Sequence, residues 1–255
     1  MEISGRSVLV TGASGGLGTA IVEELARRGA RVTVTARRVA ELESLAGRTG
    51  AQVLVADLAD DAGLAEVQVA AEAADILIAN AGVGTDVPIA EMDAEHVDRS
   101  IAVNLRAPIL LAAAFVNARV AARLPGQVVF IGSLSGLAPT PMTRMYNATK
   151  FGLRGFALSL REDLIGTGVG VSIVEPGFIR DAGMFAEGGI ELPPGVRTKA
   201  PADVADGVVR AIAEDRGEVF VAPVELRVAA TLATVAPAIS SRVQRRIGTA
   251  ELKSS

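Results

Sequence analysis

Residues 6–30, "RSVLVTGASGGLGTAIVEELARRGA", decide the fold of this chain. The β-branched run at 6–12 is compact and stops at a glycine, which predicts a buried strand. In 18–30, Ile21, Val22 and Leu25 recur at helical spacing, and Gly29 can end the helix. The stretch therefore predicts a strand, a glycine-rich loop and a helix in direct succession.

The loop "TGASGGLG" (11–18) has the features of an anion site. Gly12, Gly16 and Gly18 carry no Cβ where the chain turns sharply and a ligand must come close. The helix that follows directs free N–H groups and its positive end at the loop. We expect the loop to hold a pyrophosphate, although glycines also form ordinary turns.

The rest of the chain alternates short apolar runs with helical patterns. Further strands are predicted at 31–37, 51–58, 75–82, 126–133, 169–177 and 217–222, and the helices between them include 93–122, 144–166 and 202–215. Strands that are apolar throughout are typical of a parallel sheet covered on both faces. The pattern predicts one doubly wound α/β domain of seven parallel strands, with ligands beyond the carboxyl ends of the strands.

Composition narrows the functional classes. Of the 255 residues 50% are hydrophobic, and the net charge of −4 gives no electrostatic case for nucleic acid. Cysteine is absent, which excludes disulfides and cysteine-ligated zinc, and His96 is the only histidine, so we expect no metal site. The amino terminus lacks the layout of a signal peptide, and we expect a cytoplasmic protein.

The end of the second predicted strand bears on which nucleotide binds. A site for NAD places an acidic residue there, but Ala36 stands at that position and Arg37 and Arg38 follow. Guanidinium groups bind a 2′-phosphate, whereas a carboxylate would repel it. The segment favours NADP(H) over NAD(H), unless both arginines are merely solvated.

Tyr146 is the only tyrosine, and Lys150, one of three lysines, follows four residues later. Residues at this spacing share one helix face. A nearby ammonium and the helix amino terminus would lower the phenol pKa from about 10 and let Tyr146 exchange a proton with a carbonyl oxygen or an alcohol. Ser133, at a strand end, can hydrogen-bond the reacting oxygen. The alternative makes Tyr146 a half-buried core residue and Ser133 a strand-end cap.

Further landmarks occur in a fixed order along the chain. They are the loop 11–18, Asp57, "NAG" at 80–82, Asn104, Ser133, the Tyr146–Lys150 pair, and Pro176-Gly177. In this order and spacing the chain resembles the short-chain dehydrogenase/reductase family over about residues 5–222.

The resemblance implies a Rossmann-type fold, a nicotinamide cofactor and a set of site residues. The implied catalytic residues are Ser133, Tyr146, Lys150 and Asn104, with Lys150 also holding the nicotinamide ribose and Asn104 anchoring it through water. The implied cofactor contacts are Gly12, Ser14, Gly16, Leu17, Gly18, Arg37, Arg38, Asp57, Leu58, Asn80, Ala81, Gly82, Tyr146, Lys150, Pro176, Gly177 and Ile179.

Two features depart from the family pattern. Asp181 stands where the family often has a cofactor-contacting threonine, and we interpret it as a helix cap. The chain also continues beyond the domain at 1–222 into an apolar and basic extension at 223–255, with Arg242, Arg245 and Arg246. This extension either packs on its own domain, covers the substrate cleft, forms a subunit interface or contacts a membrane peripherally. We expect a homodimer rather than the usual tetramer.

Two segments should flank the substrate: 134–145, and 178–200 as a lid. Their apolar residues, Leu134, Leu137, Met142, Phe178, Ile179, Met184, Phe185, Ile190 and Leu192, predict an apolar ketone, aldehyde or alcohol substrate. Arg144 would either hold an anionic tail or be solvated.

The leading hypothesis is therefore an NADP(H)-dependent carbonyl reductase or alcohol dehydrogenase. A sugar-nucleotide epimerase or dehydratase is an alternative, although only about 75 residues follow Pro176-Gly177. A catalytically silent NADP(H)-binding sensor or scaffold is the other alternative, against which the intact Ser133, Tyr146 and Lys150 argue.

Overall fold

A computed structural model describes residues 1–84, 87–140, 143–181, 196–236 and 238. Its core is one sheet of seven parallel strands in the order β3-β2-β1-β4-β5-β6-β7. The strands are β1 (Ser7–Thr11), β2 (Arg31–Ala36), β3 (Gln52–Val55), β4 (Ile76–Ala79), β5 (Gly126–Ile131), β6 (Val169–Pro176) and β7 (Glu218–Val221). The doubly wound parallel sheet predicted from the sequence is confirmed, with each strand inside its predicted range.

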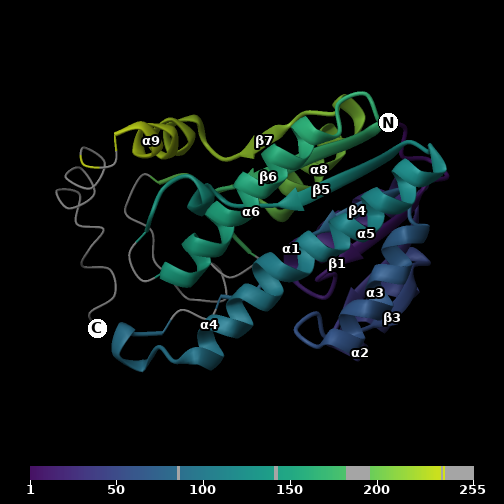
Figure 1. Ribbon diagram of the computed structural model, residues 1–255, viewed down its shortest axis with the longest axis horizontal. Coiled ribbons are helices and arrows are strands. Elements are labelled where there is room, and N and C mark those ends of the chain that lie inside the picture. The colour runs from purple at the N-terminus through teal and green to yellow at the C-terminus, as the bar shows by residue number, and fades with distance from the viewer. Residues whose placement is uncertain (85–86, 141–142, 182–195, 237, 239–255) are drawn as a thin grey trace.

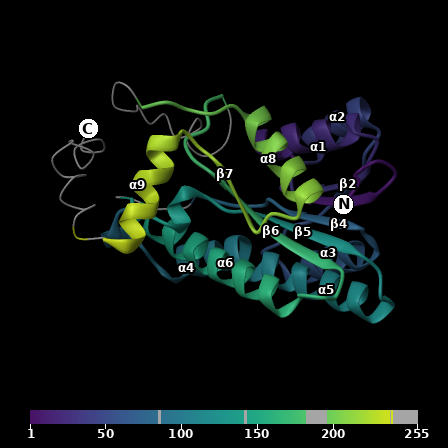
Figure 2. The same cartoon turned by 90° about the horizontal axis from the view of Figure 1, so that it is seen from above.

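Helices cover both faces of this sheet (Figures 1 and 2). One layer holds α1 (Gly16–Arg27), α2 (Val39–Thr49) and α8 (Pro201–Glu214), and the other holds α3 (Asp61–Ala73), α4 (Ala94–Ile101), α5 (Ala107–Ala122) and α6 (Arg144–Asp163). Short turns η1 (Ile89–Glu91) and η3 (Leu134–Gly136), the π-helical segment η2 (Ala102–Arg106), and α9 (Val224–Val235) complete the described elements.

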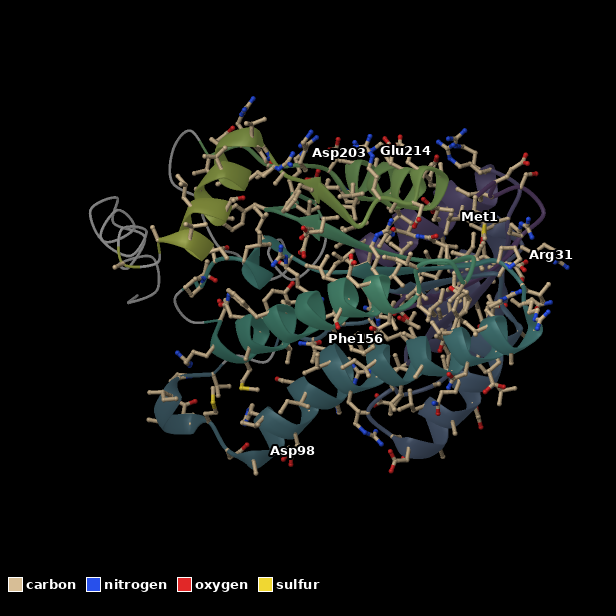
Figure 3. All side chains as sticks on the ribbon, turned by 45° about the horizontal axis from the view of Figure 1, so that its top comes forward. Met1, Arg31, Asp98, Phe156, Asp203 and Glu214 are labelled. Atoms are coloured by element: carbon tan, nitrogen blue, oxygen red, sulfur yellow. The ribbon has the colours of Figure 1, made fainter. Side chains whose placement is uncertain are left out.

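The alternation of side chains along a strand explains the two layers. In β1, Val8 and Val10 pack into the core with Leu25 of α1, whereas Leu9 packs into the opposite core with Phe115 of α5. Successive residues of a strand point to opposite faces, so an apolar strand buries both faces at once. Exposed charged residues lie on the outside of the helix layers: Asp98 on α4 and Glu214 on α8 lie at opposite outer edges (Figure 3).

The prediction of one uninterrupted helix over 93–122 is wrong in one respect. The π-helical segment η2 separates α4 from α5. Pro108 stands in the first turn of α5, where a proline ring clashes with the carbonyl of the residue four positions earlier, Asn104. A locally wider turn relieves that clash and is a common feature of functional sites.

The combined helix Ala94–Ala122 is the one helix of the described residues that is long and apolar enough to cross a membrane. Leu111, Ala112 and Phe115 of α5 are buried against the sheet and α3. Their burial identifies this segment as a core helix of the domain.

The strand order reverses beside β1, which pairs with β2 on one side and β4 on the other. In such sheets ligands bind beyond the carboxyl ends of the strands at this point. The helix α9 lies at the same end (Figures 1 and 2). Thr234 of α9 donates to the carbonyl of Leu137 at 3.0 Å, so α9 packs on its own domain beside the predicted substrate loop.

Candidate active site

The glycine loop is folded tightly against the end of β4. Gly12 has a φ of +64°, and a Cβ on it would lie 2.6 Å from the Cα of Ala81. A Cβ on Gly18 would lie 2.8 Å from the Cα of Ala13, inside the loop itself. Because neither position admits a side chain, these two glycines set the path of the backbone in the predicted phosphate site.

Two polar side chains, those of Asn80 and Thr11, join the glycine loop to the segment after β4 by hydrogen bonds. The amide of Asn80 donates to the carbonyls of Thr11 and Gly12 at 3.0 and 3.1 Å. The hydroxyl of Thr11 accepts from the N–H groups of Asn80 and Ala81, both at 3.0 Å. Asn80, predicted as a cofactor contact, therefore directs its side chain at the loop. Thr11 was missed, although a polar residue at the end of an apolar strand was its signal.

The start of α1 is suited to an anion. Its N-cap, Gly15, makes no side-chain cap, and the first turn contains no acidic residue. The guanidinium of Arg38 donates to the carbonyl of Ser14 at 2.6 Å and to its hydroxyl at 3.3 Å, and remains exposed. Free N–H groups and a held guanidinium fit the pyrophosphate and the 2′-phosphate of NADP(H).

Asp57 follows β3 and lies near two arginines. One carboxylate oxygen accepts from the N–H of Ala59 at 3.0 Å, and the other lies 3.8 Å from Arg37 and 3.6 Å from Arg99. Half of the Arg37 side chain stays exposed, so it remains accessible to a second anion. The neighbouring Leu58 is buried.

The remaining predicted cofactor contacts surround the same end of the sheet. Ser14, Gly16 and Leu17 lie in the loop and at the start of α1, Gly82 follows β4, and Pro176, Gly177 and Ile179 lie at or after the end of β6. Ile179 is buried and forms an isolated bridge with Lys199. The fold thus brings these residues to one edge.

Ser133, Tyr146 and Lys150 form a single cluster. Ser133 lies just beyond β5, and its hydroxyl accepts from the N–H of Ser135 at 3.1 Å, which leaves its own proton available. A side-chain hydrogen bond joins Ser133 to Tyr146. The ammonium of Lys150 lies 5.6 Å from the centre of the Tyr146 ring and donates to the carbonyl of Ile131 at 2.7 Å.

The expected lowering of the Tyr146 pKa is wrong for this structure. Burial raises the pKa of Tyr146 to about 12; the hydrogen bond with Ser133 opposes the rise and the charge of Glu175 adds to it. Loss of solvation disfavours the charged form of any acid, and here it is the largest cause of the shift. The phenol therefore keeps its proton at neutral pH and is suited to donate it.

Burial acts on the lysine in the opposite direction. It lowers the pKa of Lys150 to about 8, and the charge of Glu175 works against this shift. The side chain is only 4% exposed, so its ammonium has lost most of its hydration. Lys150 therefore changes charge just above neutral pH, next to the phenol.

Asn104 lies in the π-helical turn and is buried. Its carbonyl oxygen accepts from the N–H of Val83 at 2.8 Å, and its amide donates to the carbonyl of Val83 at 2.9 Å. The same amide lies 3.4 Å from the hydroxyl of Thr149, which donates to the carbonyl of Tyr146 at 3.0 Å. Asn104 thus joins the segment after β4 to the helix that carries the cluster.

Part of the predicted substrate region lies outside the described residues. This applies to Met142, Met184, Phe185, Ile190, Leu192 and most of the lid, and to the arginines 242, 245 and 246. Leu137 is buried next to α9. Asp181 has a φ of +66° and lies 3.4 Å from Arg180; its expected role as a helix cap concerns residues that are not described.

Glu175 was not predicted as a site residue from the sequence. This carboxyl is fully buried in β6 and accepts from the N–H of Ser133 at 2.5 Å. Its signal was a charged residue within the otherwise apolar run "VSIVEPG" at 171–177.

Comparison with known proteins identifies the family. The short chain dehydrogenase family matches residues 6–189. The chain is 36% identical over 185 residues to the 3-oxoacyl-[acyl-carrier-protein] reductase FabG of Escherichia coli, covering 70% of this chain and 75% of that one.

Two solved structures extend the likeness to nearly the whole fold. One is a short-chain dehydrogenase from Sphingobium yanoikuyae in complex with NADPH, with 28% identity, a TM-score of 0.77, and coverage of 98% of this chain and 97% of that one. The other is the bulky-bulky ketone specific alcohol dehydrogenase from Comamonas testosteroni, with 27% identity, a TM-score of 0.74, and coverage of 96% and 94%. The chain belongs to the short-chain dehydrogenase/reductase family of oxidoreductases.

Proposed function

We propose that this protein is an NADP(H)-dependent oxidoreductase that interconverts an apolar ketone or aldehyde and its alcohol, and that it is built to reduce the carbonyl. The observation that carries the proposal is the hydrogen-bonded Ser133–Tyr146 pair with the Lys150 ammonium beside the phenol ring. A hydroxyl, a phenol and an ammonium placed together in this way can transfer a proton to the substrate oxygen while the cofactor transfers a hydride.

Each side chain has a distinct task in the proposal. The Ser133 hydroxyl donates a hydrogen bond to the carbonyl oxygen as negative charge develops on it. Tyr146, protonated at neutral pH because burial raises its pKa, delivers the proton to that oxygen. Lys150 stabilises the phenolate that remains. When bound, the nicotinamide supplies the hydride.

The preference for NADP(H) rests on the arginines after β2. Arg38 is held against Ser14 of the glycine loop, with Arg37 next to it in sequence. Both are more than half exposed and so can bind a phosphate group. The relative from Sphingobium yanoikuyae, solved with NADPH, supports the same cofactor.

The apolar substrate rests on the surroundings of the cluster. Leu134 and Leu137 lie in the segment that follows Ser133, and α9 packs on that segment through Thr234. The relative from Comamonas testosteroni, described as specific for bulky ketones, supports a large apolar carbonyl. A cytoplasmic homodimer remains part of the proposal, and peripheral membrane contact stays a prediction for the extension.

The test is NADPH oxidation by the purified protein across a panel of carbonyls that runs from small polar aldehydes to bulky apolar ketones. We expect turnover with bulky ketones, greater with NADPH than with NADH. Saturable NADPH binding without turnover across the panel would favour the silent sensor. Turnover of a nucleotide sugar but not of ketones would favour the epimerase or dehydratase alternative.

A further inference from the structure

Glu175 is the acidic residue of β6, one position before the last residue of that strand, and its side chain has no exposed surface. Burying a carboxylate in an apolar sheet is costly unless it is paired or hydrogen-bonded. Its neighbours along the strand, Ile173 and Val174, are fully buried apolar residues. A carboxyl group at this place therefore requires an explanation.

One of its oxygens continues the hydrogen bonding of β5 beyond the regular ladder. Gly132 donates its N–H to the carbonyl of Val174 at 2.8 Å, the last main-chain bond between β5 and β6. The next N–H, that of Ser133, donates to Oε2 of Glu175 at 2.5 Å. The carboxyl group thus fixes the main chain at the residue whose hydroxyl contacts Tyr146.

Gly132 makes room for this arrangement. A Cβ at position 132 would overlap Oε2 of Glu175 and lie 2.7 Å from its Cδ. The carboxyl group occupies the space that any other residue at 132 would need. Gly132 and Glu175 therefore form a matched pair directly behind the catalytic serine.

The other carboxyl oxygen of Glu175, Oε1, lies near a charged side chain but accepts no hydrogen bond among the described residues. This oxygen is buried. Arg154 lies 3.9 Å from it but donates to Glu218 at 2.8 Å instead. Glu175 is therefore only incompletely paired, with Arg154 as a charged neighbour but not as a hydrogen-bond donor.

The helix α6 presents three charged or titratable groups on one face. Tyr146, Lys150 and Arg154 follow one another at intervals of four residues. Glu218 of β7 lies on the far side of Arg154. The charged and titratable groups acting on Glu175 are thus these three residues of α6 and Glu218.

We propose that Glu175 is a positioning residue of the active site: its buried carboxyl group holds the main chain of Ser133 in place beside Tyr146. The proposal rests on the proposed function for its kinetic consequence. An accompanying electrostatic role, in which the charge of Glu175 favours the ammonium form of Lys150, concerns this chain alone.

The directions of the pKa shifts agree with this role. Burial pushes the pKa of Lys150 down, and the charge of Glu175 opposes that shift. Burial likewise raises the pKa of Glu175 to about 8, against the Ser133 N–H and the charges of Lys150 and Arg154, so Glu175 ionises in the same pH range as Lys150. Where Glu175 is ionised, its charge opposes the effect of burial on Lys150, so we expect removal of this carboxyl group to lower the pKa of Lys150 further.

A titration tests the electrostatic part without any substrate. The chain has three lysines, so protein labelled with ¹³C at lysine Cε gives three signals, and that of Lys150 is identified by its absence from the Lys150→Arg protein. In Glu175→Gln we expect the Lys150 midpoint to fall by about one pH unit. Glu218→Gln is the control: it removes the same charge from the other side of Arg154, and we expect the midpoint to move much less.

An unchanged Lys150 midpoint in Glu175→Gln, or an equal fall in both variants, would overturn the electrostatic role. A fall confined to Glu175→Gln would support it, even if the wild-type protein turned over no carbonyl. In that case the proposed function would fail while the role of Glu175 would stand.

Kinetics test the role on Ser133. Glu175→Gln keeps an oxygen for the Ser133 N–H, whereas Glu175→Ala removes it, so we expect kcat to fall about tenfold further in the alanine variant with KM changed little. Equal kcat in the two variants would contradict this role. If the alanine variant does not fold, Gly132→Ala, which displaces the carboxyl group, replaces it and must show the same loss of kcat.

Discussion

In the part of the chain that the structure describes, the buried polar side-chain atoms at the amino ends of the strands all have hydrogen-bond partners, whereas some at the carboxyl ends do not. Asp75, just before β4, accepts from the N–H and the hydroxyl of Ser7 at 2.9 and 2.8 Å and from Arg119 at 2.9 Å. Burial alone would raise the pKa of Asp75, but these bonds and the charge of Arg119 hold it below its ordinary value.

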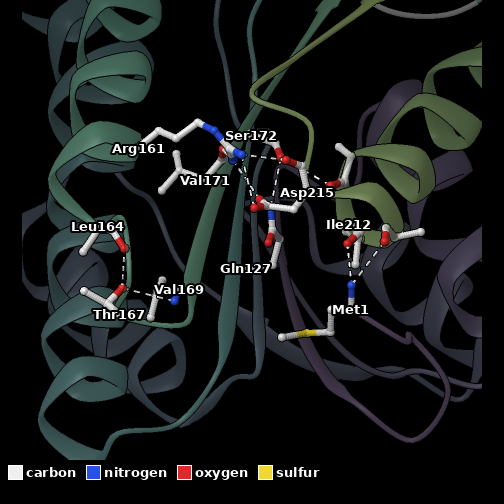
Figure 4. Close-up of polar contacts among 12 residues, drawn as sticks. Met1, Gln127, Arg161, Leu164, Thr167, Val169, Val171, Ser172, Ile212 and Asp215 are labelled. Atoms are coloured by element: carbon white, nitrogen blue, oxygen red, sulfur yellow. Dashed lines mark hydrogen bonds and ion pairs between the residues drawn. The ribbon is translucent and has the colours of Figure 1, made fainter.

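A second paired group lies at the same end, between β5, β6 and β7 (Figure 4). Arg161 of α6 donates to Asp215 and to the carbonyl of Val171, both at 2.7 Å. Gln127 donates to Ser172 at 2.9 Å. These bonds join α6, the strands and the end of α8 in one network.

At the carboxyl ends, burial dominates instead. It raises the pKa of Tyr146 to about 12 and lowers that of Lys150 to about 8, and one oxygen of Glu175 has no partner among the described residues. Complete pairing stabilises a fold, and incomplete pairing of buried groups costs free energy. The comparison indicates that stability is concentrated at one end and reactivity at the other.

The largest effect should come from Tyr146→Phe. Removing the phenol hydroxyl removes the proton donor, and we expect kcat to fall by about a thousandfold. The free energy of unfolding should change by less than about 1 kcal/mol, because the phenyl ring is kept. Turnover and denaturant unfolding of the same sample give both values; substantial residual turnover would contradict the proton-transfer role.

Asp75→Asn should have the opposite effect, lowering the stability of the fold and leaving the activity unchanged. The change leaves the buried Arg119 cation without its carboxylate, and we expect a loss of about 2 kcal/mol in the free energy of unfolding at neutral pH, with kcat unchanged. Because the folded pKa of Asp75 is lowered, its contribution is present above the unfolded pKa of about 4 and is lost as the pH falls through the lower folded value. The difference between the two proteins should therefore shrink in acid, and a constant difference would contradict the ion pair as its source.

Arg38→Ala tests the cofactor preference. We expect the KM for NADPH to rise about tenfold and that for NADH to change little, since only NADPH carries the 2′-phosphate. Arg48→Ala is the matched control, because Arg48 is an exposed arginine on the neighbouring α2 that pairs with Glu23 at 3.0 Å. Equal losses for both cofactors would show that Arg38 supports the loop rather than the phosphate.

The smallest predicted effect is the pH dependence of carbonyl reduction. With the pKa of Lys150 near 8, the ammonium form decreases above that pH, and kcat/KM should fall about fourfold between pH 7 and 8.5. A profile that stays flat to pH 9 would show that the charge of Lys150 does not assist the reaction.

The fold was predictable because each of its signals is local. The apolar strands, the glycine loop and the helical spacing after it each lie within a short stretch such as 6–30, and the structure follows them. The grouping of Ser133 with Tyr146 followed from the position of one at a strand end and the other at a helix start. Local signals of this kind survive tertiary packing.

What the sequence did not predict depends on burial and on contacts between distant segments. Lys150 was expected to lower the pKa of Tyr146, but desolvation by the packed domain reverses the sign. Glu175 contacts Ser133 across 42 positions of the chain. The π-helical turn at Asn104 likewise depends on how Pro108 is accommodated in a packed helix.

The most direct test of this account is the ionisation of Tyr146 itself. Because the chain has one tyrosine and no tryptophan, ultraviolet absorbance of tyrosinate reports this residue alone, and circular dichroism recorded in parallel reports folding. We expect the folded protein to show no tyrosinate at pH 10, and ionisation to occur near pH 12 or only with unfolding. A midpoint at or below the ordinary value of about 10 in the folded protein would contradict it.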